Sequence, residues 1–140
     1  MKNDLLNIRN LSIVGDICFF EGPLMSLFFD KKTDDFYIFD WVDVNENYNK
    51  WLVYQTNLPL LMDFFERKLT HRYILENAPN SVYYIVEVDN NLRFFPREIV
   101  DFEAFPSFYL PTEESFFSIN DCPDYDKIQN FVSSLQSIAA

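Results

Sequence analysis

Glycine and histidine are almost absent from this chain, whose 140 residues include 2 glycines and 1 histidine. With only Gly15 and Gly22, the sequence cannot form the glycine-rich loop that cradles phosphates in nucleotide-binding proteins. Any Ser-His-Asp or Cys-His arrangement would depend entirely on His71, and no GxSxG motif accompanies it. We therefore interpret His71 as a surface residue near the start of a helix, and we expect no catalytic residues.

Cysteine is also scarce. Cys18 lies in an apolar run, Cys122 precedes a proline, and no CxxC spacing occurs. Two isolated cysteines do not make a disulfide framework, so the sequence predicts two reduced thiols, with a single bridge between them as the alternative. Because Cys18 has apolar neighbours and no adjacent cation in the sequence, we do not expect it to be a nucleophile.

The sequence has no long, unbroken hydrophobic run. Its most apolar stretch, residues 11–29, is interrupted by Asp16, Glu21 and Pro23, so we do not expect it to cross a membrane. Charged residues also interrupt the N-terminal segment MKNDLLNIRN, and we expect no signal peptide. The sequence therefore predicts a cytoplasmic protein with a single domain, residues 1–140.

Basic residues are few: 11 Lys and Arg stand against 22 Asp and Glu, for a net charge of −11. Binding to nucleic acid or to an anionic membrane depends on basic residues, so we expect direct contact with neither. Residues 16–46 alone carry eight acidic and two basic residues, a net charge of −6. This charge is compatible with a basic protein partner.

Aromatic residues, in contrast, make up 19% of the chain, and both tryptophans lie between Phe19 and Tyr54. Aromatic and β-branched runs separated by polar turns indicate an antiparallel sheet. Both faces of the run 36–42 are rich in apolar residues, which predicts burial on both sides. The expected strands are 16–20, 24–30, 36–42, 51–55, 80–89 and 92–95.

Helical patterns complete the expected fold. Asn57 and Thr70 are placed as N-caps of helices over 58–69 and 71–77, and an apolar stripe predicts a last helix after Pro123. The sequence thus predicts an α+β domain: an antiparallel sheet of about five or six strands, helices packed on one face, and a C-terminal helix.

One acidic loop superficially resembles the start of a calcium-binding loop, with Asp43, Asn45 and Asn47 at alternate positions. The glycine required at the sixth position is Tyr48, and the glutamate required at the twelfth is Tyr54. The match fails, so we expect no metal site and no other cofactor.

Aromatic residues beside acidic ones are typical of an anchor for a basic protein, because Trp and Tyr are common at binding hot spots. The alternative is that Trp41 and Trp51 are core residues of the sheet. The candidate partner-binding surface consists of six residues: Asp34, Asp35, Asp43, Glu46, Tyr48 and Trp51.

Three segments resemble a family of small bacterial proteins of unknown function that share a GPLL.LF, YLFDWVD and RWLVY pattern. The matching residues are Phe20–Phe28, Tyr37–Asp43 and Lys50–Tyr54, with further similarity at Tyr84–Asp89 and Tyr109–Ser115. The resemblance covers residues 17–117. It implies no activity and no catalytic residue.

The sequence leaves several functions open. Our main hypothesis is a non-enzymatic acidic binding protein that acts through protein–protein contact, of the immunity, antitoxin or anti-defence type. The alternatives are a nucleic-acid mimic, a small metal-dependent hydrolase that uses Asp40, Asp43 and Glu46, and a small-molecule sensor. The sensor would need an aromatic sheet that walls a pocket.

Overall fold

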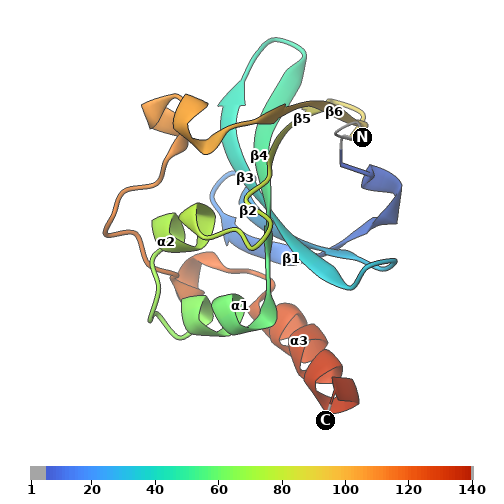
Figure 1. Ribbon diagram of the computed structural model, residues 1–140, viewed down its shortest axis with the longest axis vertical. Coiled ribbons are helices and arrows are strands. Elements are labelled where there is room, and N and C mark those ends of the chain that lie inside the picture. The colour runs from blue at the N-terminus through green and yellow to red at the C-terminus, as the bar shows by residue number, and fades with distance from the viewer. Residues whose placement is uncertain (1–5, 140) are drawn as a thin grey trace.

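Within residues 6–139, which the computed structural model describes, six strands form one antiparallel sheet, and each strand pairs with its neighbours in the sequence (Figure 1). The strands are β1 (Leu11–Phe19), β2 (Pro23–Asp30), β3 (Asp35–Val44), β4 (Tyr48–Thr56), β5 (Tyr83–Asp89) and β6 (Phe94–Val100). The α-helices are α1 (Leu58–Phe65), α2 (His71–Glu76) and α3 (Tyr125–Ala139). The predicted α+β fold, with its C-terminal helix, is confirmed.

The sheet is curled, and its two faces are both apolar. Figure 1 shows the helices outside the curl, while β6 arches over the open side toward the segment that precedes β1. Alternate residues of a strand point to opposite faces, so Phe36 and Ile38 of β3 join the core under the helices. Tyr37 and Phe39 join a second core on the concave face. Residues Phe36 to Asp40 are all buried, which confirms the predicted burial of this strand on both sides.

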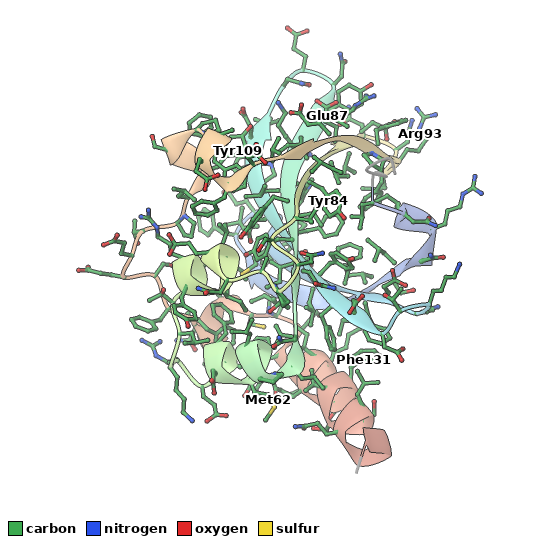
Figure 2. The ribbon with its side chains drawn as sticks, in the orientation of Figure 1. Met62, Tyr84, Glu87, Arg93, Tyr109 and Phe131 are labelled. Atoms are coloured by element: carbon green, nitrogen blue, oxygen red, sulfur yellow. The ribbon has the colours of Figure 1, made fainter. Side chains whose placement is uncertain are left out.

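The helices lie on the convex face. Their N-caps and apolar faces are those that the sequence predicted. The side chain of Asn57 accepts a hydrogen bond from the Leu60 amide at the start of α1, and Thr70 caps α2 in the same way. In α3, Phe131 packs edge-on against Phe29 of β2, with ring centres 5.1 Å apart (Figure 2). The contact between Phe131 and Phe29 holds α3 against the sheet.

Several elements differ in extent from the sequence predictions: β4 begins at Tyr48 and not at residue 51, and β5 begins at Tyr83 and not at residue 80. The helix predicted over 58–69 ends at Phe65, because Arg67 adopts a positive φ of 62° that an α-helix cannot contain. The last strand, predicted over 92–95, runs instead from Phe94 to Val100. It continues through Pro96 because β6 lies at the edge of the sheet, where a residue without an N–H can be accommodated.

The first strand also differs: β1 begins at Leu11 and not at residue 16. Its register with β2 shifts between Ile13 and Gly15 and again between Asp16 and Cys18. Each such bulge adds one residue to one strand and breaks the alternation of faces. The sequence pattern of residues 11–15 was therefore not recognisable as a strand.

Candidate functional site

The concave face of the sheet encloses a hollow of about 240 Å³ to which every strand contributes. It lies on the aromatic core of that face, and the turn between β5 and β6 contributes one exposed lining residue. Its lining residues are Ile13 and Asp16 of β1, Pro23, Ser26 and Phe28 of β2, Phe39 of β3, Trp51 of β4, Val88 of β5, Leu92 of the turn and Phe94 of β6. Only Asp16 and Ser26 among these have polar side chains.

Aromatic rings from separate strands make up much of this lining. The ring centres of Phe28 and Phe39 are 4.2 Å apart, and Phe94 lies about edge-on to both, at 6.2 and 6.1 Å. Trp51 packs against Phe39 at 6.4 Å. Aromatic pairs at such separations stabilise a core beyond the area that they bury. The rings therefore form an apolar wall of the hollow.

The polar edge of the hollow consists of Asp16 and Ser26, which are register partners across β1 and β2. The Ser26 hydroxyl, which is buried, donates to Oδ1 of Asp16 at 2.7 Å. The Asp16 amide donates to Oδ2 of Asp124, just before α3, also at 2.7 Å. Both the side chain and the backbone of Asp16 are thus held in place.

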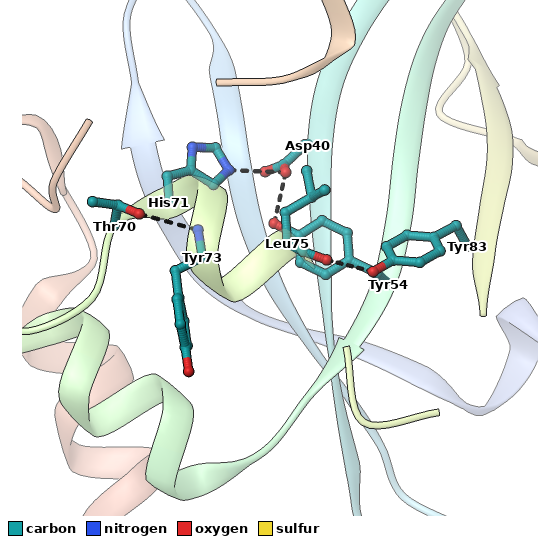
Figure 3. A network of polar contacts seen from close by, with 7 residues as sticks. All are labelled: Asp40, Tyr54, Thr70, His71, Tyr73, Leu75 and Tyr83. Atoms are coloured by element: carbon teal, nitrogen blue, oxygen red, sulfur yellow. Dashed lines mark hydrogen bonds and ion pairs between the residues drawn. The ribbon is translucent and has the colours of Figure 1, made fainter. Parts of the chain in front are cut away.

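A second polar cluster lies between the convex face and α2 (Figure 3). Oδ2 of Asp40 accepts the hydroxyl of Tyr54 at 2.7 Å and lies 2.9 Å from Nε2 of His71. The interpretation of His71 as a surface residue is wrong. His71 does begin a helix, but its ring turns inward to a buried carboxylate, and its side chain is only 20% exposed.

Protonation in this cluster favours an ion pair. Burial lowers the pKa of His71, but the adjacent Asp40 carboxylate raises it by more, so that the pKa lies above the ordinary 6.5. Burial, reinforced by Asp40, raises the pKa of Tyr54 well above its ordinary value, and the phenol stays protonated. Both neighbours of Asp40 can therefore donate a hydrogen bond to its carboxylate.

Cys18 lies beside this cluster and is not arranged as a nucleophile. It lines an adjacent hollow of about 330 Å³ together with Asp40 and His71. Burial, and then the nearby carboxylates of Asp121 and Asp40, raise the pKa of its thiol. A nucleophilic cysteine needs a lowered pKa and a cationic environment. The Asp40 cluster is thus better suited to fixing α2 against the sheet than to covalent chemistry.

The structure does not bring the six predicted partner-binding residues together. Asp34 and Asp35 lie at one end of β3, while Asp43 and Glu46 lie at the other; at 3.3 Å per residue, Asp35 and Asp43 are separated by about 26 Å along the strand. Tyr48 is partly exposed near the second group. Trp51 is only 9% exposed and belongs to the concave core.

Of those six residues, only Trp51 lines the hollow. Sequence reasoning missed Asp16 and Ser26, which look like isolated polar residues in apolar strands. The available signal was the second apolar face: Phe28, Phe39 and Trp51 all occupy the face of their strands opposite the helices. An apolar face without a covering helix indicates either a second layer or a cavity.

The residues predicted for a metal-dependent hydrolase are likewise separated by the fold. Asp40 is buried with Tyr54 and His71, whereas the carboxylate of Asp43 accepts from the Val44 amide. Among the residues that the structure describes, no three His, Cys, Asp or Glu side chains are placed to share a metal ion. Within the same part of the chain, no helix has both the length and the apolar character needed to span a membrane.

Comparisons with protein families, curated proteins and solved structures gave no match to this chain. The resemblance to a family of small bacterial proteins therefore stays a prediction. The residues that carry it are largely structural: Phe39 and Trp51 lie in the concave core, and Leu52 and Tyr54 lie in the core under the helices.

Proposed function

We propose that this protein is a non-enzymatic binding protein that holds a small, largely apolar molecule within its curled sheet. The observation that supports this function is the hollow of about 240 Å³, which is lined by all six strands and has side chains that are polar only at Asp16 and Ser26. Ligand sites in proteins are typically apolar concavities with a few polar groups that orient the ligand. Among the alternatives from the sequence, this arrangement supports the small-molecule sensor.

The volume limits the size of the ligand. Drug-sized ligands occupy pockets of roughly 300–1,000 Å³, and an apolar cavity of about 150 Å³ holds benzene. A hollow of about 240 Å³ lies between these limits and has room for one ring with a short side chain. Its rings favour an aromatic ligand, because offset and edge-on contacts add to the stabilisation from burial.

Trp51 provides a direct test because it lines the hollow, whereas Trp41 is 38% exposed and lies outside it. In a Trp41→Phe variant, Trp51 is the only tryptophan, so the tryptophan emission reports on the hollow alone. Titration with 2-phenylethanol should change its emission in a saturable way and raise the melting midpoint, because a ligand that binds only the folded state stabilises it. Glucose, a polar molecule of similar size, should do neither.

Absence of any saturable change with 2-phenylethanol, 2-phenylethylamine and 3-phenylpropanoate alike would overturn the proposed function. Together these probes cover neutral, cationic and anionic single-ring ligands, so that a failure of all three does not reflect the choice of charge.

A second function, contact with a basic protein, is supported by a separate observation. The turn after β1 and the turn after β3 lie at the same end of the sheet, because Phe19 pairs with Pro23 and Met25 with Asp40. This end presents exposed apolar side chains, among them Phe20 at 72%, and the exposed acid Glu46. Aromatic anchors surrounded by charge are typical of protein-binding surfaces.

We propose this surface as the site at which an immunity-like or antitoxin-like function would act. A pull-down from the native host should return a basic protein whose capture weakens as salt rises. The double variant Phe20→Ala, Glu46→Gln should lose that protein, while Glu114→Gln, which removes one exposed acid from a different segment, should retain it. Recovery of only salt-insensitive proteins, or equal capture by both variants, would contradict the proposal.

A further inference from the structure

The hollow contains one charged side chain, that of Asp16, among four aromatic rings: Phe28, Phe39, Trp51 and Phe94. Asp16 is partly exposed, so a ligand in the hollow can reach its carboxylate. Ser26 provides one hydrogen bond, to Oδ1. Among the residues that the structure describes, none donates a hydrogen bond to Oδ2 and no Lys or Arg lines the hollow.

The first bulge of β1, between Ile13 and Gly15, is the reason why Ile13 and Asp16 both face the hollow. Ile13 and Asp16 are three residues apart, and in a regular strand they would point to opposite faces. Because of this register shift, Ile13 pairs with Phe28 and Asp16 pairs with Ser26. All four side chains then lie on the concave face and line the hollow. Bulges commonly re-aim a side chain in this way.

The orientation of Asp16 is also fixed before any ligand arrives. Its amide is bound by the Asp124 carboxylate at 2.7 Å, and its carbonyl accepts the thiol of Cys122 at 3.5 Å. Both contacts come from the segment that leads into α3, on the far side of the sheet. Ser26 holds the carboxylate on the near side. A preorganised polar group loses little further freedom when it binds a ligand.

We infer that the ligand of the hollow is an aromatic amine that carries a positively charged nitrogen, and that Asp16 receives this nitrogen; the inference rests on the proposed ligand-binding function. An ammonium group donates hydrogen bonds to a carboxylate, and such charge-assisted bonds are among the strongest in proteins. The faces of Trp and Phe rings attract cations. The same lining repels an anionic ligand, because it contains the Asp16 carboxylate and no Lys or Arg among its described residues.

The test compares three ligands of nearly equal size on the Trp41→Phe protein, with the emission of Trp51 as the readout. The ligands are 2-phenylethylamine (cation), 2-phenylethanol (neutral) and 3-phenylpropanoate (anion). We expect the amine to bind roughly tenfold more tightly than the alcohol at low salt, which is the scale of one charge-assisted hydrogen bond, and the acid to bind most weakly. This comparison requires no change to Asp16.

The variant Asp16→Asn removes the charge but retains an oxygen that can accept from Ser26. In this variant the affinity for the amine should fall toward that for the alcohol, so that the ratio of the two affinities approaches one. Glu114→Gln is the matched control, because it removes one exposed charge from a segment outside the hollow and should leave all affinities unchanged. A thermal melt confirms that each variant is folded.

The outcomes separate the inference from the function on which it rests. Binding of the alcohol with equal or greater affinity than the amine, or an amine affinity that Asp16→Asn does not reduce, would overturn the inference and leave a neutral apolar site. Absence of binding by all three ligands would overturn the proposed function itself.

Discussion

Nε2 of His71 lies 2.9 Å from Oδ2 of Asp40, the same oxygen that accepts the hydroxyl of Tyr54 at 2.7 Å. These contacts join the first residue of α2 to two central strands, β3 and β4. The other oxygen of Asp40, Oδ1, is buried and has no hydrogen-bond partner among the described residues. The stability of this junction therefore depends on the two donors that share Oδ2.

The His71–Asp40 pair predicts how stability changes with pH. Because the pKa of His71 is raised above 6.5 in the folded protein, the protonated imidazole stabilises the fold. This contribution is fully present below pH 6.5, the unfolded value, and is lost as pH rises through the folded pKa. The free energy of unfolding of the wild type should fall across this window, relative to a His71→Gln variant measured in parallel.

The chain has 1 histidine, so proton NMR reads this pKa directly from a single imidazole signal. A titration midpoint at or below 6.5 would contradict the ion pair. Asp40→Asn should shift the midpoint downward, because it removes the charge that raises it and leaves the burial that lowers it.

Substitutions of two tyrosines measure how much the hydrogen bond from Tyr54 to Asp40 contributes to stability. Tyr54→Phe removes a hydrogen bond to a carboxylate and should cost about 1.5–3 kcal/mol of unfolding free energy. Tyr83→Phe removes the bond from its hydroxyl to the Leu75 carbonyl, a neutral acceptor at 2.6 Å, and should cost about 0.5–1.5 kcal/mol. Denaturant unfolding of both variants gives the difference, and a Tyr83→Phe variant that loses more would contradict the dominant role of Asp40.

Gly15 should tolerate no side chain. A Cβ at this position would lie 2.8 Å from Cβ of Asp124 and 2.9 Å from Cγ1 of Ile128, where α3 packs on β1. Gly15→Ala should therefore destabilise the protein by about 1–3 kcal/mol through overpacking. Ile128→Ala makes room beside this site, so the double variant should lose less stability than the sum of the two single variants. If the stability losses of the two single variants simply add, α3 must be able to shift away from β1 to make room for the methyl group of Gly15→Ala without help from the Ile128→Ala change.

Filling the hollow should abolish ligand binding without unfolding the protein. Val88 lines the hollow, and Val88→Phe places a ring where the ligand would lie. We expect the melting midpoint to stay close to that of the wild type and the response of Trp51 to 2-phenylethanol to disappear. The matched control is Val132→Phe, which adds the same volume to the buried core under α3 and should destabilise the fold. Retained binding by Val88→Phe would place the ligand elsewhere.

The sheet was largely predictable because aromatic and β-branched runs, polar turns and helix caps are local signals. The helix caps Asn57 and Thr70 and the doubly buried strand around Phe39 illustrate this. The first half of β1 was not predictable, because its bulges destroy the alternation on which strand recognition depends.

The candidate site was less accessible to sequence reasoning. Asp40 meets Tyr54 and His71 from 14 and 31 residues away, and the hollow combines residues of all six strands. Such proximity arises from the curl of the sheet, and a single sequence carries no local signal for curl. Asp34 and Glu46 belong to the acidic segment that stood out in the composition. In the fold they lie at opposite ends of β3.

The central claim is that a small aromatic molecule binds inside the curled sheet, and methyl NMR tests it most directly. On addition of 2-phenylethanol or 2-phenylethylamine, the methyl signals of Ile13, Val88 and Leu92, which line the hollow, should shift in a saturable way. The methyl signals of Ile74, Ile128 and Val132, in the core under the helices, should stay in place. Shifts confined to the second group, or no saturable shift in either group, would contradict the account.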